Sequence, residues 1–258
     1  MFFTDLDGTL LDHETYSYEA ASEALDALRA HDIPLILASS KTAAEISPLR
    51  RALGFQHCEA IVENGAGLLL AGEQETSSAK DYHKLLEKVA TIPALYRDHF
   101  TGFSNWDAAE ISKRTGLTIA AARLAKARQF SEPGIWSGSD DALEEFHSLL
   151  KQEGIIAQRG GRFLTLSFGG QKADQIQTII NRHGSKSDIP FCVALGDAPN
   201  DIAMLEAADL GVIIPNPTHN GINQLRGEAT GQIIRAAFSG PKGWNDAVLN
   251  VLRETEIL

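Results

Sequence analysis

Asp5 and Asp7 offer the clearest chemistry in the chain. They belong to the run Asp5-Leu6-Asp7-Gly8-Thr9, which follows directly on an apolar segment. If that segment is a strand, both carboxylates lie at its carboxyl end, where open α/β sheets build ligand sites. One carboxylate can attack phosphorus and hold it as an acyl phosphate, which splits hydrolysis into two easier steps. The other can give a proton to the leaving oxygen and take one from water.

Asp197 and Asp201 form a second acidic group, in the run Gly196 to Asp201. This run follows the apolar segment 191–195, so a second strand would also present carboxylates at its carboxyl end. Mg²⁺ prefers oxygen ligands in an octahedron and usually keeps several waters. We therefore expect one magnesium site, built from two carboxylates, a carbonyl, phosphate and water. For either acidic run alone, a solvated turn is the ordinary alternative.

Ser39 and Lys172 are the candidates for holding phosphate, whose charge is spread over three oxygens during transfer. Ser39 ends the second predicted strand and offers a hydroxyl and a backbone amide. Lys172 precedes a helical pattern at 173–181 and can place its ammonium beside phosphate and Asp5. Each has an ordinary alternative. Ser39 could cap a helix, as Ser40 and Thr42 could, and Lys172 could be a solvated surface charge.

Apolar patterns predict the elements that must position these residues. Strands and helices alternate at 2–6, 17–31, 34–38, 42–53 and 60–62. The alternation returns with strands at 191–195, 211–214 and 232–235 and helices at 201–208 and 245–252. Such a rhythm is typical of a parallel sheet with helices on its faces. The predicted fold class is therefore α/β, with a Rossmann-like parallel sheet core.

Residues 77–168 differ in content from both parts of this core. They contain helical patterns at 81–95, 118–126 and 140–153 and short strand patterns at 127–132, 134–137, 155–159 and 163–167. Gly160-Gly161 predicts a turn between the last two strands. We interpret the segment as an inserted α+β cap domain, which leaves residues 1–76 and 169–258 as the core. The polar stretch 73–78 and the pair Gly169-Gly170 are the predicted linkers.

Composition excludes several classes of partner. The chain has 258 residues, 43% of them apolar, and a formal net charge of -11. Nucleic acid and anionic membranes need basic surface, so neither is an expected partner. A small anionic substrate must instead be attracted by a local positive site. The sequence does not indicate an oligomeric state.

The start of the sequence and its apolar runs bear on the cellular location of the protein. The chain opens directly on the first predicted strand, and no apolar run approaches the roughly 20 residues of a membrane span. We therefore expect a cytoplasmic protein. Cys58 and Cys192 lack the paired spacing of a zinc or redox motif and are expected to be buried, reduced thiols.

The motifs taken in chain order resemble those of the haloacid dehalogenase superfamily. The resemblance rests on Asp5-x-Asp7-Gly8-Thr9, on Ser39, on Lys172 and on Gly196-Asp197-x-x-Asn200-Asp201. It implies that Asp5 is the nucleophile and Asp7 the acid and base. It also implies that the carboxylates of Asp5 and Asp197 and the carbonyl of Asp7 bind Mg²⁺. The inserted segment resembles the C2 class of cap, of the B type.

The same resemblance implies further roles around this site. Ser39 and Lys172 are expected to bind phosphate and Asn200 to bind the substrate. Asp201 is expected to support the metal ligands without binding the ion itself. Additional runs are similar to the mannosyl-3-phosphoglycerate phosphatase family: 38–42, 62–66, 115–117, 128–133, 160–163 and 240–244. Members of that family convert mannosyl-3-phosphoglycerate to mannosylglycerate and phosphate, so this reaction is the expected one.

Recognition of a glycosyl glycerate needs groups for its carboxylate and its sugar hydroxyls. Arg128 and Arg162 are the candidates for the carboxylate, because arginine can form two parallel hydrogen bonds with it. Lys41 is a further cationic candidate, and Glu132 could accept hydrogen bonds from sugar hydroxyls. For each of them a solvated surface charge is the alternative.

Three other functions stay open on the sequence alone. The substrate could be the glucosyl counterpart, glucosyl-3-phosphoglycerate. A phosphomannomutase-like phosphotransferase would interconvert sugar phosphates with little release of phosphate. A non-catalytic sugar-phosphate sensor would bind its ligand without turnover although its magnesium site was filled.

Overall fold

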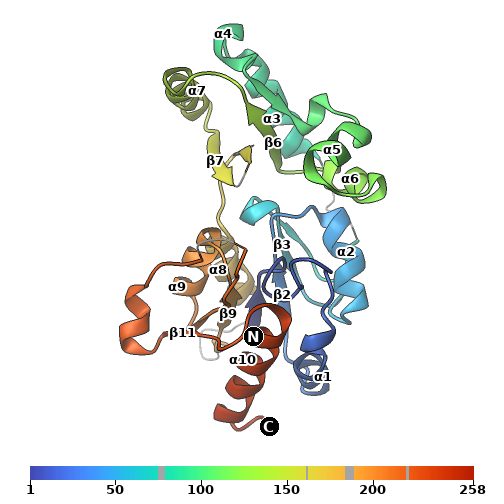
Figure 1. The fold of residues 1–258 in the computed structure, drawn as a ribbon, viewed down its shortest axis with the longest axis vertical. Coiled ribbons are helices and arrows are strands. Elements are labelled where there is room, and N and C mark those ends of the chain that lie inside the picture. Colours follow the sequence, from blue (N-terminus) through green and yellow to red (C-terminus); the bar gives the residue numbers. More distant parts are fainter. Residues whose placement is uncertain (75–78, 161, 184–188, 219–220) are drawn as a thin grey trace.

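Two sheets organise the chain (Figure 1). The computed structural model describes residues 1–74, 79–160, 162–183, 189–218 and 221–258. Within these residues the larger sheet has the strand order β11-β10-β9-β1-β2-β3-β4. Its strands are β1 (Phe2–Thr4), β2 (Leu35–Ala38), β3 (Ala60–Val62), β4 (Gly67–Leu69), β9 (Val193–Gly196), β10 (Leu210–Ile213) and β11 (Ile233–Arg235). All neighbouring pairs are parallel except β3 with β4.

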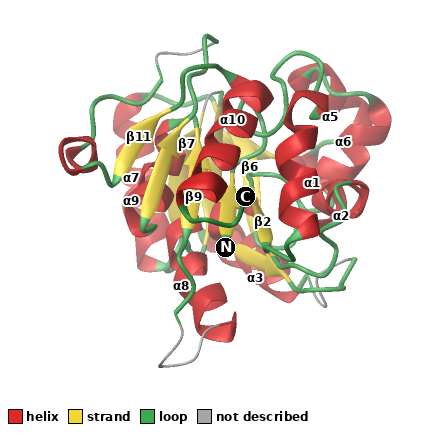
Figure 2. Ribbon diagram, turned by 90° about the horizontal axis from the view of Figure 1, so that it is seen from below, coloured by secondary structure: helices red, strands yellow, loops and turns green. Residues whose placement is uncertain are grey.

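Helices flank this sheet (Figure 2). They are α1 (Ser22–Ala30), α2 (Ala43–Ala52), α8 (Lys172–His183), α9 (Ile202–Ala207) and α10 (Gly240–Glu254), with short 3-10 turns at Glu19–Ala21, Glu63–Gly65, Pro199–Asp201 and Arg226–Thr230. α1 packs against α10, and α8 packs against α9. The side chains of β1, β2 and β9 are buried throughout, as expected of parallel strands covered on both faces.

The second sheet is antiparallel and has the order β5-β6-β8-β7. Its strands are β5 (Phe100–Gly102), β6 (Ser131–Trp136), β7 (Ile156–Gly160) and β8 (Phe163–Ser167). Around it lie α3 (Lys80–Thr91), α4 (Ala94–Arg97), α5 (Ala108–Thr115), α6 (Ile119–Lys126), α7 (Asp140–Gln152) and a 3-10 turn at Phe103–Asn105. This sheet has apolar clusters of its own, separate from the core around the first. The predicted α/β fold with a parallel core and an α+β insertion is therefore confirmed.

Several predicted elements differ in detail from the structure. The two strands predicted at 127–132 and 134–137 are one strand, β6, which continues through Pro133. Pro133 lies one residue beyond the last pair between β6 and β5, where a missing N–H is tolerated. The strands β4 and β5 and the helix α5 were not predicted, and α10 begins five residues earlier than expected.

The predicted boundaries of the insertion, at residues 77 and 168, stay a prediction. The linker predicted at 73–78 falls largely outside the described residues, as does Gly161 of the predicted turn. At the return linker, Gly169 and Gly170 have φ values of +98° and +99°. Such φ angles are readily adopted only by glycine. The two glycines therefore permit the backbone conformation that the chain has at this point.

Gly65 fixes the start of α8 against the turn that follows β3. Its φ is +94°, and a Cβ placed there would lie 2.2 Å from the main-chain carbonyl carbon of Gln171. The carbonyl of Gly65 also accepts a hydrogen bond from the Gln175 side chain at 2.9 Å. Only glycine permits this approach, which sets the position of Lys172 at the first turn of α8.

We expect Gly65→Ala to lower the free energy of unfolding by roughly 3 kcal/mol, because backbone must move as well as adopt a strained angle. Gly116→Ala is the matched control. Gly116 also has a left-handed φ, of +83°. Among the described residues other than its chain neighbours, none has a heavy atom within 4 Å of its added Cβ, so only the angular strain of about 1–2 kcal/mol applies. Urea unfolding of both variants would test the difference, and equal losses would contradict close packing at Gly65.

Candidate active site

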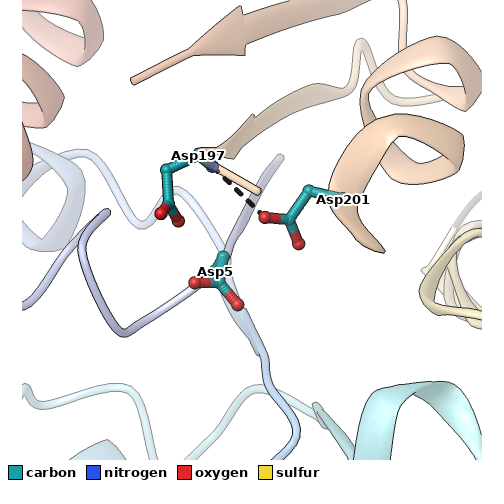
Figure 3. A group of neighbouring side chains, drawn as sticks. All are labelled: Asp5, Asp197 and Asp201. Atoms are coloured by element: carbon teal, nitrogen blue, oxygen red, sulfur yellow. Dashed lines mark hydrogen bonds between the residues drawn. The ribbon is translucent and has the colours of Figure 1, made fainter. Parts of the chain in front are cut away.

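Three buried carboxylates meet at the carboxyl ends of β1 and β9. Asp5 follows β1, Asp197 follows β9, and Asp201 lies at the start of α9. Figure 3 shows the three side chains grouped where these elements meet. One oxygen from each lies within 4.8 Å of the others. They meet because β1 and β9 are neighbouring parallel strands, aligned at Thr4 and Leu195, so their ends share one edge of the sheet.

Lys172 supplies a positive charge that partly balances these carboxylates. Its Nζ lies 2.5 Å from Asp5 Oδ1 and 2.7 Å from Asp201 Oδ1, and the side chain is only 2% exposed. The predicted place of Lys172 beside Asp5 is therefore observed, and the alternative of a solvated surface charge is wrong. The other oxygen of Asp201 accepts the backbone N–H groups of Asp197 and Ala198 at 3.2 and 3.1 Å. Both oxygens of Asp201 are thus occupied by donors.

Asp197 is oriented by Thr9 and Asn216. The Thr9 hydroxyl donates to Asp197 Oδ1 and the Asn216 amide to Oδ2, each at 2.7 Å. Asn216 can come this close because Gly8 has no Cβ. A Cβ at Gly8 would lie 2.3 Å from the Asn216 amide nitrogen, and φ at Gly8 is +86°. Asn216 was not predicted, since it belongs to no motif and follows β10, far along the chain.

Burial and charge perturb this group strongly. Burial raises the pKa of Asp5 well above its usual value, the negative charges of Asp201 and Asp197 add to that rise, and Lys172 opposes it. Burial lowers the pKa of Lys172, but Asp201 and Asp5 outweigh it and leave the pKa raised. Three ionised carboxylates beside one ammonium leave an excess of two negative charges. A divalent cation with oxygen ligands fits this donor set.

Asp7 forms a separate pair with Lys41. Lys41 Nζ lies 2.7 Å from Asp7 Oδ2, and both side chains are partly exposed. Burial lowers the pKa of Lys41, but Asp7 and other anions outweigh it and raise the pKa overall. Among the described residues, the other carboxylate oxygen of Asp7 is buried and has no hydrogen-bond partner. An oxygen in this position is available for a proton or a ligand.

Ser39 is buried at the end of β2, and it does not cap α2. Its backbone amide donates to the carbonyl of Ile61 at 3.0 Å, so the expected offer of that amide to phosphate is wrong. Its hydroxyl oxygen accepts the Lys41 amide at 3.3 Å, which leaves the hydroxyl proton for a ligand. Thr42 is the residue that caps α2, in a reciprocal pair with Glu45.

A cavity of about 940 Å³ adjoins these residues and lies between the parts of the chain that form the two sheets. Lys41, Lys172 and Asn200 line it from the first part, and Arg128 and Arg159 line it from the second. Arg159 was not predicted. It stands on β7, next to a glycine run that predicted only a turn. A cavity with several cations in its wall is suited to an anion larger than phosphate.

Comparison with known proteins places this site in a family. The sequence pattern of haloacid dehalogenase-like hydrolases matches residues 2–104 and 137–226 of the chain. The chain belongs to the haloacid dehalogenase-like hydrolase family. The resemblance drawn from the motifs is therefore confirmed. Among the described residues, no helix is long and apolar enough to cross a membrane.

Named relatives of this hydrolase extend over nearly the whole chain. The glucosyl-3-phosphoglycerate/mannosyl-3-phosphoglycerate phosphatase of Persephonella marina is 33% identical, covering 99% of this chain and 98% of that protein. The protein of the same name in Methanococcoides burtonii is 32% identical, covering 98% and 97%. The similarity to mannosyl-3-phosphoglycerate phosphatases seen in the sequence is thus confirmed.

Solved structures with low sequence identity share the fold of this hydrolase. A haloacid dehalogenase-like hydrolase from Bacteroides thetaiotaomicron has a TM-score of 0.67 at 19% identity, covering 97% of this chain and 98% of that one. The sucrose-phosphatase from Synechocystis sp. PCC6803 has a TM-score of 0.60 at 14% identity, covering 99% and 97%. Both therefore have the same overall arrangement of sheet and insertion.

The structure of this haloacid dehalogenase-like hydrolase separates the remaining candidates. Asn200 is exposed at the cavity wall, and its amide nitrogen lies 3.5 Å from Asn64 Oδ1. Arg162 is not among the residues that line the cavity, and it donates to the carbonyls of Arg114 and Thr115. Its role in binding stays a prediction. Glu132 is 1% exposed and accepts from Tyr82 and Ser104, so it does not face a sugar.

Lys172→Met removes the cation between Asp5 and Asp201, and we expect it to destabilise this hydrolase by about 3–5 kcal/mol at pH 8. The pKa of Asp5 in the folded state, already raised, would rise further above its unfolded value. A raised carboxyl pKa favours the folded state at low pH, so the loss should shrink as pH falls toward 5. Urea unfolding at both pH values measures this.

Lys88→Met is the control for Lys172→Met, because Lys88 pairs with Glu153 at 2.7 Å while both side chains are partly exposed. Its loss should be within about 1 kcal/mol at either pH. A loss in Lys172→Met that does not depend on pH would contradict the charge balance described for the site.

Proposed function

We propose that the chain is a magnesium-dependent phosphatase that converts mannosyl-3-phosphoglycerate to mannosylglycerate and phosphate through an aspartyl-phosphate on Asp5. One observation carries the proposal. Relatives named as phosphatases of this compound and its glucosyl counterpart align with almost the whole chain at 33% and 32% identity. The cluster around Asp5 and the cavity beside Lys172 support the same reaction.

Asp5 and Asp197 are the carboxylates that we propose as Mg²⁺ ligands, with the main-chain carbonyl of Asp7. We propose that Asp201 supports them by holding Lys172 with one oxygen and the amides of Asp197 and Ala198 with the other. When bound, the ion neutralises negative charge on the phosphoryl oxygens and the carboxylates.

The chain's own residues account for both half-reactions in the proposal. A carboxylate oxygen of Asp5 attacks phosphorus as the bond from phosphorus to the glycerate oxygen breaks, and Asp7 gives its proton to that oxygen. Asp7 then takes a proton from a water that attacks phosphorus, so the acyl phosphate breaks and Asp5 is regenerated. Lys172 and the Ser39 hydroxyl hold phosphoryl oxygens during both steps.

The part of the substrate beyond its phosphate would occupy the cavity. Its carboxylate needs a cation, and Arg128 stands in the wall that the inserted segment contributes. Asn200 is proposed as a polar contact on the opposite wall. In this proposal residues 1–76 and 169–258 form the catalytic core and residues 77–168 form the C2-type cap, which selects the substrate. We also propose that the enzyme acts in the cytoplasm, in mannosylglycerate biosynthesis.

The proposed function predicts magnesium-dependent phosphate release with a strong preference for one glycosyl-3-phosphoglycerate. The panel contains the mannosyl and glucosyl compounds, mannose phosphates and 3-phosphoglycerate, with and without Mg²⁺. Asp5→Asn should abolish release, whereas Asp26→Asn, an exposed carboxylate on α1, should leave it unchanged. Weak release of phosphate from all members of the panel would refute the proposed substrate. Interconversion of sugar phosphates without release would refute hydrolysis in favour of phosphotransfer.

Mg²⁺ should also stabilise the fold, by about 2.7 kcal/mol when present at 100 times its dissociation constant. The raised pKa of Asp5 lets protons compete with the ion, so the shift in melting temperature should be larger at pH 8 than at pH 5. Asp197→Asn should remove the shift. Thermal unfolding with and without Mg²⁺ measures it, and a full shift in Asp197→Asn would show that the proposed ligand set is wrong.

A further inference from the structure

The carboxylate of Glu63 is buried near the site but takes no part in the chemistry above. Glu63 directly follows β3, at the end of the larger sheet that faces the second sheet (Figure 1). Its φ is +51° and that of Asn64 is +60°. Two successive residues with side chains in the left-handed region cost about 1–2 kcal/mol each, so surrounding contacts must hold them there.

The backbone of this turn holds the loop that carries Ser39 and Lys41. The amide of Glu63 donates to the carbonyl of Lys41, and the amide of Asn64 donates to the carbonyl of Ser39, both at 2.9 Å. The strained angles thus aim two consecutive amides at the loop that bears the phosphate-binding hydroxyl. The position of the loop depends on the position of the turn.

The Glu63 side chain points the other way, into the inserted segment. Its carboxylate accepts the backbone N–H groups of Gln129, Phe130 and Ser131 at 2.8, 3.2 and 2.8 Å. It also accepts the Ser131 hydroxyl at 2.7 Å. One buried carboxylate therefore fixes the backbone of three consecutive residues that lead into β6. Hydrogen bonds to an ionised group are about twice as strong as neutral ones, so this is a firm attachment.

Arg128 completes the arrangement. Its Nε lies 3.2 Å from Glu63 Oε2, Nη2 donates to the Ser131 hydroxyl at 2.6 Å, and Nη1 donates to the carbonyl of Ser40 at 3.3 Å. Arg128 is 8% exposed and lines the cavity together with Lys41 and Lys172. A guanidinium has five N–H donors, so these contacts leave donors for a ligand in the cavity.

We propose that Glu63 is a positioning residue that sets Arg128 and the 128–131 segment against the loop of Ser39 and Lys41. It acts through Arg128 and does not touch the reacting atoms. By joining the phosphate-binding loop to the cation that faces the rest of the substrate, Glu63 fixes the distance between the two halves of the binding site. The inference rests on the proposed function for the identity of the substrate, but the attachment itself does not.

The consequence differs between large and small substrates. A glycosyl phosphoglycerate must contact the phosphate loop and Arg128 at once, whereas para-nitrophenyl phosphate needs only the phosphate loop. Loss of the Glu63 charge should therefore penalise the large substrate selectively. We expect the loss of charge-assisted hydrogen bonds to lower kcat/KM for the large substrate by about 10- to 100-fold.

The test compares Glu63→Gln with Glu132→Gln. Glu132 is an equally buried carboxylate, but its partners Tyr82 and Ser104 lie within the inserted segment. Glu63→Gln should lower kcat/KM for the glycosyl phosphoglycerate by about 10- to 100-fold, through KM, and change that for para-nitrophenyl phosphate less than about threefold. It should also speed amide exchange at residues 129–131. Glu132→Gln should change neither the substrate ratio nor exchange at those amides.

If Glu63→Gln does not fold, Arg128→Lys is the second variant, because it leaves the hydrogen bonds from the three backbone amides to Glu63 in place. It should shift the substrate ratio in the same direction, and the double variant should shift it no further than Glu63→Gln alone. An unchanged ratio in Arg128→Lys, or amides at 129–131 that exchange at the wild-type rate in Glu63→Gln, would overturn the inference. If the wild-type enzyme hydrolyses only the small ester, the proposed substrate fails, and the exchange rates still decide the role of Glu63.

Discussion

The burial of four charges beside one another is the constraint on which the rest of this structure depends. Each ion removed from water costs several kcal/mol, so Asp5, Asp197 and Asp201 can stay buried only if their partners are held in place. The parallel pairing of β1 with β9 brings the acids together, and the close contact at Gly65 delivers Lys172. The sheet order and the start of α8 are therefore requirements of the site as much as of the core.

The inserted segment adds what the sheet edge lacks. Strand ends alone would form an open site, in which water competes with every hydrogen bond to the phosphoryl group. The segment from α6 to β6 contacts the core through Glu63 and through the Thr42 hydroxyl, which donates to the carbonyl of Leu124 at 2.9 Å. Because these attachments lie beside the loop of Ser39 and Lys41, they fix the insertion relative to the residues that we propose to hold phosphate.

Much of the core of this site could be predicted from the sequence, because its residues follow apolar runs and the carboxyl ends of parallel strands share one edge. Asp5, Asp197 and Lys172 meet as expected on these grounds. Asn216 and the partners of Glu63 could not be predicted. Asn216 lies in a loop without a motif, and Glu63 binds backbone amides, which every sequence offers equally. Pro133 led to a predicted break in β6 because its tolerance depends on where β5 ends, which is a tertiary fact.

The distribution of charge reconciles a net charge of -11 with the proposed anionic substrate. The excess negative charge of the cluster of Asp5, Asp197 and Asp201 suits a cation, while the cavity wall presents Lys41, Arg128, Arg159 and Lys172. Three of these cations have specific anionic partners: Lys41 pairs with Asp7, Arg128 with Glu63, and Lys172 with Asp5 and Asp201. Arg159, on the far strand β7, is exposed and stands outside these pairs. It can therefore contribute its charge to attracting an anion from solution, whereas the paired cations contribute mainly through directed hydrogen bonds once the anion has arrived.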